Sequence, residues 1–235
     1  MARIQSNACA SHPRRRGKSK GSEGPLLVPV LDAAPAFAQA AATDGIVLAE
    51  QQTFDWLTEA GHLGLEYAAM QRRDPALRVP VTAAVEALTT IYSRLRGDPV
   101  VLRSLRTNLL LTVDLVHEIT GTVIELDESK HFTSFRLKAL DVYPPGTALG
   151  FDLDEYRELC RAWSSKTDNV DRAFAAKGFG FGGRQRERAY RDALLDLGAP
   201  AMGLPPVRRV VALDGDGTAA YAREREQIMQ TLGNR

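Results

Sequence analysis

The sequence predicts an α+β protein that is mainly α-helical, with a central antiparallel helical hairpin, a small β-hairpin or sheet, and C-terminal helices. Three observations lead to this fold class. Apolar residues recur at three- and four-residue steps over residues 81–119, as they do on one face of an α-helix. Residues 122–142 are instead rich in β-branched and alternating apolar residues. Helical spacing then resumes after residue 152.

Composition divides the chain into a basic tail and one globular domain. The 235 residues carry a formal net charge of +1 and are 44% hydrophobic. Residues 1–25 hold six basic side chains and one acidic side chain, and they have too few apolar groups to offset the entropy of ordering. We expect residues 1–25 to be a disordered basic tail that can neutralise phosphates. The alternative is a tail that only aids solubility or that results from an over-extended start codon. Residues 26–235 should form a single domain, helical over 44–121 and mixed α/β over 122–235.

The N-terminal region does not match an export signal. The apolar run at residues 26–31 is broken by Pro29 and followed by Asp32, whereas a secretory signal needs about 7–15 apolar residues. No stretch approaches the roughly 18 apolar residues of a membrane span. Two cysteines are too few for a disulfide scaffold. We therefore expect a cytoplasmic protein with no membrane partner.

Helical spacing dominates the first half of the domain. Residues 46–73 predict one kinked helix or two short ones, interrupted by Gly61 and Gly64. Residues 74–80 contain two prolines and predict a connector, because proline removes a backbone donor and disfavours helix before it. Residues 81–95 then predict an amphipathic helix.

A second amphipathic helix is predicted after the Asp98-Pro99 pair. Aspartate is a favoured N-cap and proline suits the first helical position, and apolar spacing then continues to Ile119. Because few residues separate the two helices, they should pack as an antiparallel hairpin over residues 81–119. The broad apolar face of the second helix makes this hairpin a candidate homodimer interface.

The second half of the chain alternates between strand and helix signals. Residues 122–126 and 132–142 predict the two strands of a β-hairpin around residues 127–130. The remaining elements are helices at 152–163, 168–177 and 184–197, a strand at 208–213 and a terminal helix at 219–232.

An apolar strand at residues 210–213 is followed by Asp214-Gly215-Asp216-Gly217-Thr218. This segment resembles the first motif of the haloacid-dehalogenase-like phosphatases. The resemblance implies that Asp214 is a nucleophile and Asp216 a general acid, but it covers nine residues. That family needs later strands to complete a magnesium site, and 19 residues follow Asp216 here. The alternative is a turn, in which Asp and Gly supply the required backbone angles.

Other metal motifs are incomplete. The segment that begins His117-Glu118 has Gly121 where the H-E-x-x-H zinc helix requires its second histidine. Asp114 would share a helical face with His117, which permits a polar pair. A calcium loop starting at Asp214 fails at its glutamate position. We therefore assign no catalytic residue, metal or cofactor from the sequence.

The most distinctive segment runs from Lys177 to Arg191 and combines glycines, two phenylalanines and arginines. Glycines allow close backbone approach to a ligand, phenylalanines can stack on bases, and arginines bind phosphates. The alternative is a loop whose phenylalanines pack into the core and whose arginines face solvent. The candidate phosphate-binding residues are Arg14, Arg15, Arg16, Lys177, Gly180, Gly182, Arg184, Arg186 and Arg188.

These features favour a nucleic-acid-associated regulator or accessory protein that contacts DNA or RNA phosphates through the tail and the Gly/Arg segment. One alternative is a protein-interaction or dimerisation module that uses the 81–119 hairpin without nucleic acid. A second alternative is a phosphate-handling enzyme that uses Asp214 and Asp216, which requires these residues to lie beside the Gly/Arg segment.

Overall fold

The computed structural model describes residues 33–233. It confirms a mainly helical α+β fold, since these residues form eight α-helices and six short strands. Among these helices, none combines the length and apolar character needed to cross a bilayer. The predictions for the tail, including Arg14, Arg15 and Arg16, lie outside the described residues.

The helices are α1 (Ala33–Thr43), α2 (His62–Arg72), α3 (Arg78–Arg94), α4 (Pro99–Ser104), α5 (Ser134–Leu140), α6 (Leu153–Thr167), α7 (Arg184–Ala201) and α8 (Gly217–Leu232). The strands are β1 (Ala49–Glu50), β2 (Thr53–Thr58), β3 (Leu110–Thr112), β4 (Leu115–His117), β5 (Thr122–Asp127) and β6 (Arg208–Val211). Two short 3₁₀ turns are η1 (Pro75–Leu77) and η2 (Ser129–His131).

Four strands form the main sheet in the order β1-β4-β5-β6. β4 pairs antiparallel with β1 and with β5, whereas β5 and β6 run parallel. A parallel pair needs a long crossover, and the chain between β5 and β6 contains α5, α6 and α7. The crossover therefore brings α7 back across the sheet.

The pairing of β1 with β4 continues into a separate two-stranded ribbon of β2 and β3. The chain bends between the two ladders at Gln51, which has a φ of 52° and donates its N–H to the carbonyl of Asp114 (3.1 Å). Val113 donates to the carbonyl of Gln52 (2.9 Å) in the same junction. The bend places Asp114 where the ribbon meets the main sheet.

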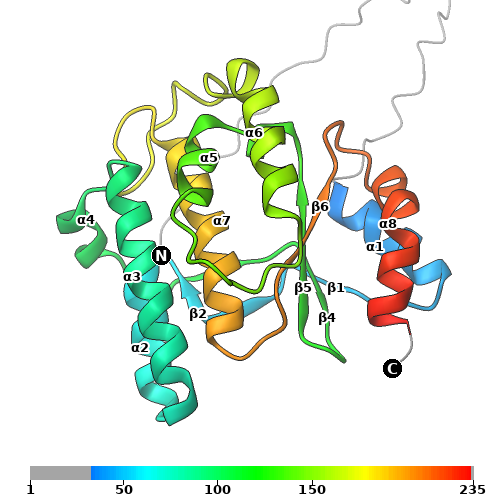
Figure 1. The fold of residues 1–235 in the computed structure, drawn as a ribbon, viewed down its shortest axis with the longest axis horizontal. Helices are drawn as coiled ribbons and strands as arrows, with labels where there is room; N and C mark the ends of the chain where they lie inside the picture. Colours follow the sequence, from blue (N-terminus) through cyan, green and yellow to red (C-terminus); the bar gives the residue numbers. More distant parts are fainter. Residues whose placement is uncertain (1–32, 234–235) are drawn as a thin grey trace, which may run out of the picture. The chain divides into compact units, whose positions relative to one another are not determined.

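Helices cover the two faces of the main sheet in separate layers (Figure 1). α1 and α8 pack on one face, against Ile124 and Leu126 of β5. The other helices pack on the opposite face, where Val123 joins their core. Because side chains alternate along a strand, Glu125 and Asp127 point to the same side as Val123. β5 thus turns two carboxylates toward α7.

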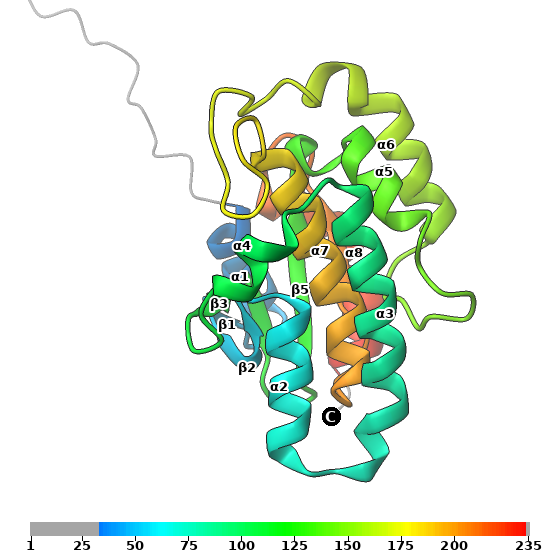
Figure 2. The same cartoon turned by 90° about the vertical axis from the view of Figure 1, so that its left-hand side faces the viewer.

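Helices α2, α3 and α7 lie side by side on that second face (Figure 2). Tyr92 of α3 and Tyr190 of α7 pack edge to face, with ring centroids 5.0 Å apart. Phe179 stacks against Tyr92 at 4.9 Å, and it is buried. This aromatic cluster anchors the Gly-rich segment that precedes α7.

The predicted helical hairpin over residues 81–119 is wrong in its second half. α3 forms, but it begins at Arg78 and includes Pro80 in its first turn, so the predicted connector over residues 74–80 is wrong at its end. The carboxylate of Asp98 caps α4 by accepting from Val100 and Val101. However, α4 ends at Ser104, and residues 110–117 form β3 and β4. Consecutive apolar residues there pack on opposite faces of a sheet, which suits a strand. The long helical face proposed for dimerisation is therefore not formed.

The predicted helical character of residues 44–121 is also wrong at its start. Residues 46–58 include β1 and β2, and the helix begins at His62. Phe54 and Trp56 belong to a β2 strand that packs beneath α7, and Trp56 is fully buried. Tertiary contacts with α7 outweigh the helical spacing of this segment.

Two predictions in the second half are also wrong. The strand expected at residues 132–142 is helix α5, because Thr133 caps it by accepting from the N–H of Arg136 (3.0 Å). β5 pairs with β4 instead of with that segment. Residues 168–177 form turns in place of a short helix. The predictions of α6, α7, β6 and α8 are confirmed.

Candidate active site

An open cavity of about 440 Å³ lies between α7 and the β2–β3 ribbon. Leucines of the ribbon and of α7 supply its apolar lining. The sheet and η2 contribute Asp114, Glu125 and His131, and α7 contributes Arg184, Glu187, Arg188, Arg191 and Asp192. The cavity therefore brings acidic groups of the sheet to face basic groups of a helix.

Asp114 and Glu125 are neighbours across β4 and β5 and hold each other in place. The N–H of Asp114 donates to Oε1 of Glu125 (3.1 Å), and the N–H of Leu126 donates to Oδ2 of Asp114 (3.0 Å). Within residues 33–233, neither carboxylate forms an ion pair. Burial, followed by the charge of Asp114, raises the pKa of Glu125 well above its usual range. Burial also raises the pKa of Asp114.

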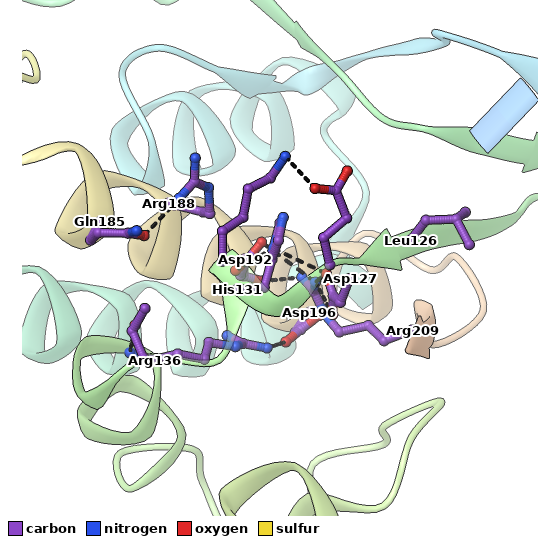
Figure 3. Close-up of polar contacts among 12 residues, drawn as sticks. Leu126, Asp127, His131, Arg136, Gln185, Arg188, Asp192, Asp196 and Arg209 are labelled. Atoms are coloured by element: carbon purple, nitrogen blue, oxygen red, sulfur yellow. Dashed lines mark hydrogen bonds and ion pairs between the residues drawn. The ribbon is translucent and has the colours of Figure 1, made fainter. Parts of the chain in front are cut away.

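Arg209 of β6 is at the centre of a buried ion-pair network beside this pair (Figure 3). It pairs in register with Glu125 on β5, so its side chain points to the same face of the sheet. Its guanidinium donates to Asp127 (2.9 and 3.0 Å) and to Asp196 (2.7 Å). Asp192 lies 3.4 Å from the same group.

Arg136 of α5 extends the network on the side away from the cavity. Its guanidinium donates to Asp196 (2.6 Å) and to the hydroxyl of Tyr143 (2.8 Å). Tyr156 donates to Asp127 (2.6 Å). Protein donors therefore already engage Asp127 and Asp196, which makes these two carboxylates structural anchors.

The charges in this region do not balance. Five carboxylates belong to it: Asp114, Glu125, Asp127, Asp192 and Asp196. The buried cations that face them are Arg136 and Arg209. Burial acts to lower the pKa of His131, but two neighbouring aspartates raise it above its ordinary value. With all five carboxylates ionised and His131 protonated, two negative charges would remain, and the raised pKa values of Asp114 and Glu125 relieve this excess by favouring their protonated forms. A cation at Asp114 and Glu125 would be stabilised.

The arginines of α7 are held in position at the cavity by acidic partners. Glu187 lies between Arg184 (2.9 Å) and Arg191 (2.9 Å) on the same helix. Arg188 contacts Asp171 (3.2 Å) and donates to Gln185 (2.6 Å). The three guanidiniums exceed these two carboxylates by one charge. Guanidiniums fixed in this way are suited to bind phosphate oxygens.

The structure separates the other residues of the predicted phosphate site. Lys177 pairs with Glu59 (3.0 Å) and lies outside the cavity of Asp114. Gly180 has a φ of 66° and bridges to Ala176 in a tight loop. Gly182 and Arg186 line a different cavity. Of the candidates in the described chain, Arg184 and Arg188 therefore share the cavity with the carboxylates.

The two phenylalanines of the segment behave differently. Phe179 packs into the core, as the structural alternative predicted. The ring of Phe181 is 78% exposed and does not pack there. Arg186 donates to the carbonyls of both residues (2.6 and 3.3 Å), which fixes the loop between them.

Asp214 and Asp216 form a turn at the start of α8. The side chain of Asp214 accepts from the N–H of Asp216 (3.2 Å), and that of Asp216 caps α8 through the N–H of Ala219 (2.9 Å). The turn between β6 and α8 lies on the α1 side of the sheet, whereas the 177–183 loop lies beside α3 and α7 (Figure 1). The arrangement that a phosphatase interpretation requires is not observed.

Sequence reasoning missed Asp114, Glu125, His131 and Asp192. The helical interpretation put Asp114 on one helix with His117, but both lie in or beside β4, and Nδ1 of His117 contacts Thr120 (2.9 Å). A usable signal is present in β5, where two acidic residues alternate within an apolar strand. Such a pattern places carboxylates together on one face of a sheet.

A family described as "Family of unknown function (DUF7255)" matches residues 90–173. The matched segment is 84 of the 235 residues and contains Asp114, Glu125 and His131, but not Asp192 or the arginines of α7. No curated protein matches the chain, and no solved structure matches it.

Proposed function

We propose that the protein is a hydrolase that cleaves phosphodiester bonds of nucleic acid with the help of a divalent cation. The observation that carries the proposal is the single cavity that Asp114 and Glu125 share with Arg184, Arg188 and Arg191. Carboxylates without a cationic partner suit a hard metal ion, and guanidiniums suit phosphate.

Asp114 and Glu125 would hold the cation. Mg²⁺ is commonly bound through one or two carboxylates together with substrate phosphates and water. One oxygen of each carboxylate accepts a backbone hydrogen bond, which orients the side chain and leaves the other oxygen available. Asp192 and His131 border the same cavity, and together with Asp127 their ligand atoms lie within 4.8 Å of one another. This group does not include Asp114 or Glu125, and its two aspartates already contact Arg209.

A bound cation would polarise a phosphate oxygen and lower the pKa of a water molecule. The oxygen of such a water would form a bond to phosphorus as the bond from phosphorus to the sugar oxygen breaks, and a proton from the water would end on that sugar oxygen. The role of Arg184, Arg188 and Arg191 is to hold the substrate phosphates and stabilise their charge.

The test compares cleavage of labelled single- and double-stranded DNA and RNA in Mg²⁺, Mn²⁺ and EDTA. We expect metal-dependent cleavage that falls at least about 100-fold in Asp114→Asn and in Glu125→Gln, since both variants lose charge at the cation. The matched control is Asp214→Asn, which removes a carboxylate outside the cavity and should cleave normally.

Calorimetry of Mn²⁺ binding provides a second measurement that does not depend on the choice of substrate. The wild-type protein should bind Mn²⁺, and both cavity variants should lose this binding while unfolding at a normal temperature. Wild-type protein that binds no divalent cation and cleaves none of the four substrates would rule the proposal out.

A second candidate is a non-catalytic nucleic-acid-associated regulator, in line with the expectation from the sequence. It is favoured by the net positive charge of the α7 arginines, which is independent of any metal. Binding of nucleic acid in EDTA without cleavage in Mg²⁺ would select this function. A cytoplasmic location remains a prediction.

A further inference from the structure

A second cavity, of about 580 Å³, lies on the other side of the N-terminal turns of α7. Its lining includes five basic side chains from four separate parts of the chain: Arg94, Arg96, Lys138, Arg172 and Arg186. Asp168 is the acidic residue in the lining, and its Oδ1 already accepts from the N–H of Ser134 (2.8 Å). The cavity is therefore strongly positive.

None of these five basic residues forms an ion pair within the described part of the chain. The contrast with the other cavity is clear, because the three arginines there are all paired with acids. Arg186 is directed by backbone carbonyls, and Lys138 lies over the ring of Phe135 (5.4 Å). Unpaired cations gathered in a concave surface attract a polyanion.

Phe181 supplies the second, independent feature. This residue belongs to the same cavity lining and is 78% exposed. The carbonyl of Phe181 is held by Arg186, so the loop is fixed beside the cations. An exposed aromatic ring beside cations is the arrangement on which unpaired bases stack while the phosphates are neutralised.

We propose that this basic cavity binds single-stranded nucleic acid. Phosphates would contact the five basic side chains, and one unpaired base would stack on Phe181. A duplex presents its bases already stacked on one another, so it would gain the phosphate contacts but not the contact with Phe181. That the bound single strand of nucleic acid is also the substrate rests on the proposed function. The two cavities are adjacent, because Arg186 of this cavity and Arg184 of the other lie on the same turn of α7.

The experiment measures binding of fluorescent oligo(dT) and oligo(U), and of a DNA duplex, in EDTA across a salt series. EDTA removes any contribution of metal and cleavage, so the result does not depend on catalysis. We expect Phe181→Ala to weaken single-strand binding by about fivefold or more and to leave duplex binding unchanged. Phe174→Ala is the matched control, because that ring is 63% exposed and is not part of the cavity lining.

Two further variants test the cations. Arg96→Ala and Arg172→Ala should each weaken single-strand binding and lower the slope of log affinity against log salt by about 0.7 for each phosphate that the variant no longer neutralises. Arg223→Ala, an exposed arginine on α8, should change neither. Because this binding is measured in EDTA and cleavage is measured in Mg²⁺, failure of this proposal can be told apart from failure of the proposed function.

Any of four outcomes would overturn the inference. One is the absence of single-strand binding at low salt, and another is an equal weakening of binding in the Phe174 and Phe181 variants. The third is duplex binding that is as tight as single-strand binding and equally sensitive to Phe181. Preferential binding of an acidic polypeptide, unaffected by Phe181→Ala, would assign the cavity to a protein partner instead.

Discussion

Burial decides what single ionisable residues do in this protein. His62 is buried at the start of α2, where its backbone N–H donates to the hydroxyl of Tyr190 (3.0 Å). The same hydroxyl also forms a hydrogen bond with Nδ1 of His62 (2.7 Å). Burial lowers the pKa of His62 to about 4.

This arrangement predicts a dependence of stability on pH. The pKa of His62 is lower in the folded chain than in the unfolded chain. The contribution of the neutral His62 ring to the free energy of unfolding is therefore complete above about pH 6.5 and is lost as the pH falls toward 4. The loss should approach about 3 kcal/mol, or somewhat less because the ring is not wholly shielded from water. Urea unfolding at several pH values measures it.

The control for this prediction is His62→Asn, which keeps a side chain able to hydrogen-bond Tyr190 but does not titrate. The difference in unfolding free energy between wild type and variant should shrink or reverse from pH 7 to pH 4. A difference that stays constant across this range would contradict the role assigned to His62.

Individual site residues differ in how far the sequence can predict them. Arg184 and Arg188 are predicted from local composition, because a run of arginines after glycines is visible in one short segment. Asp114 and Glu125 are 11 residues apart and become neighbours through strand pairing. Their juxtaposition cannot be inferred while the segment of Asp114 is assigned to a helix.

At the level of elements, α7 shows how tertiary contacts change the meaning of a residue. Gly198 is expected from the sequence to end this helix, but α7 continues to Ala201. Glycine stands at this position because residue 198 faces the buried ring of Trp56, where an added Cβ would lie 2.7 Å from the ring. Gly198 therefore allows α7 to approach β2 closely.

Gly198→Ala is expected to destabilise the protein, even though alanine favours a helix over glycine by about 1 kcal/mol. The clash with Trp56 should cost about 1–3 kcal/mol, because the ring is fully buried and has little room to move. Thermal unfolding should show a lower Tm. Gly233→Ala is a poor control because it also crowds the backbone. Ala222→Gly, at an exposed position of α8, tests helix propensity alone. A higher Tm for Gly198→Ala would refute the close contact.

At the level of the whole molecule, the core depends on helices from both ends of the described chain. α1 and α8 cover one face of the sheet, and Phe37 of α1 packs edge to face on Tyr221 of α8. The link continues at the end of α1, where Asp44 accepts from Tyr221 (2.7 Å) and Arg225 (2.7 Å). Without α1, this face of the sheet would be open to water.

Removal of α1 should therefore abolish cooperative folding. A chain that starts at Asp44 exposes the apolar groups that α1 covers, and it should bind a hydrophobic dye and lose its near-ultraviolet circular dichroism. A chain that starts at Leu31 keeps α1 and should unfold in one cooperative transition. Equal stability of the two chains would show that α1 does not belong to the core.

The sequence by itself determined the features that depend on neighbouring residues. These are the helices α3, α6, α7 and α8, the cap at Asp98, and the arginine-rich start of α7, because capping and helical periodicity act within a few residues. The tertiary structure decided which short apolar segments became strands, since a strand is stabilised by partners that are distant in the chain. It also placed two carboxylates opposite the arginines, which the sequence alone could not reveal because strand pairing and a helical crossover bring them together.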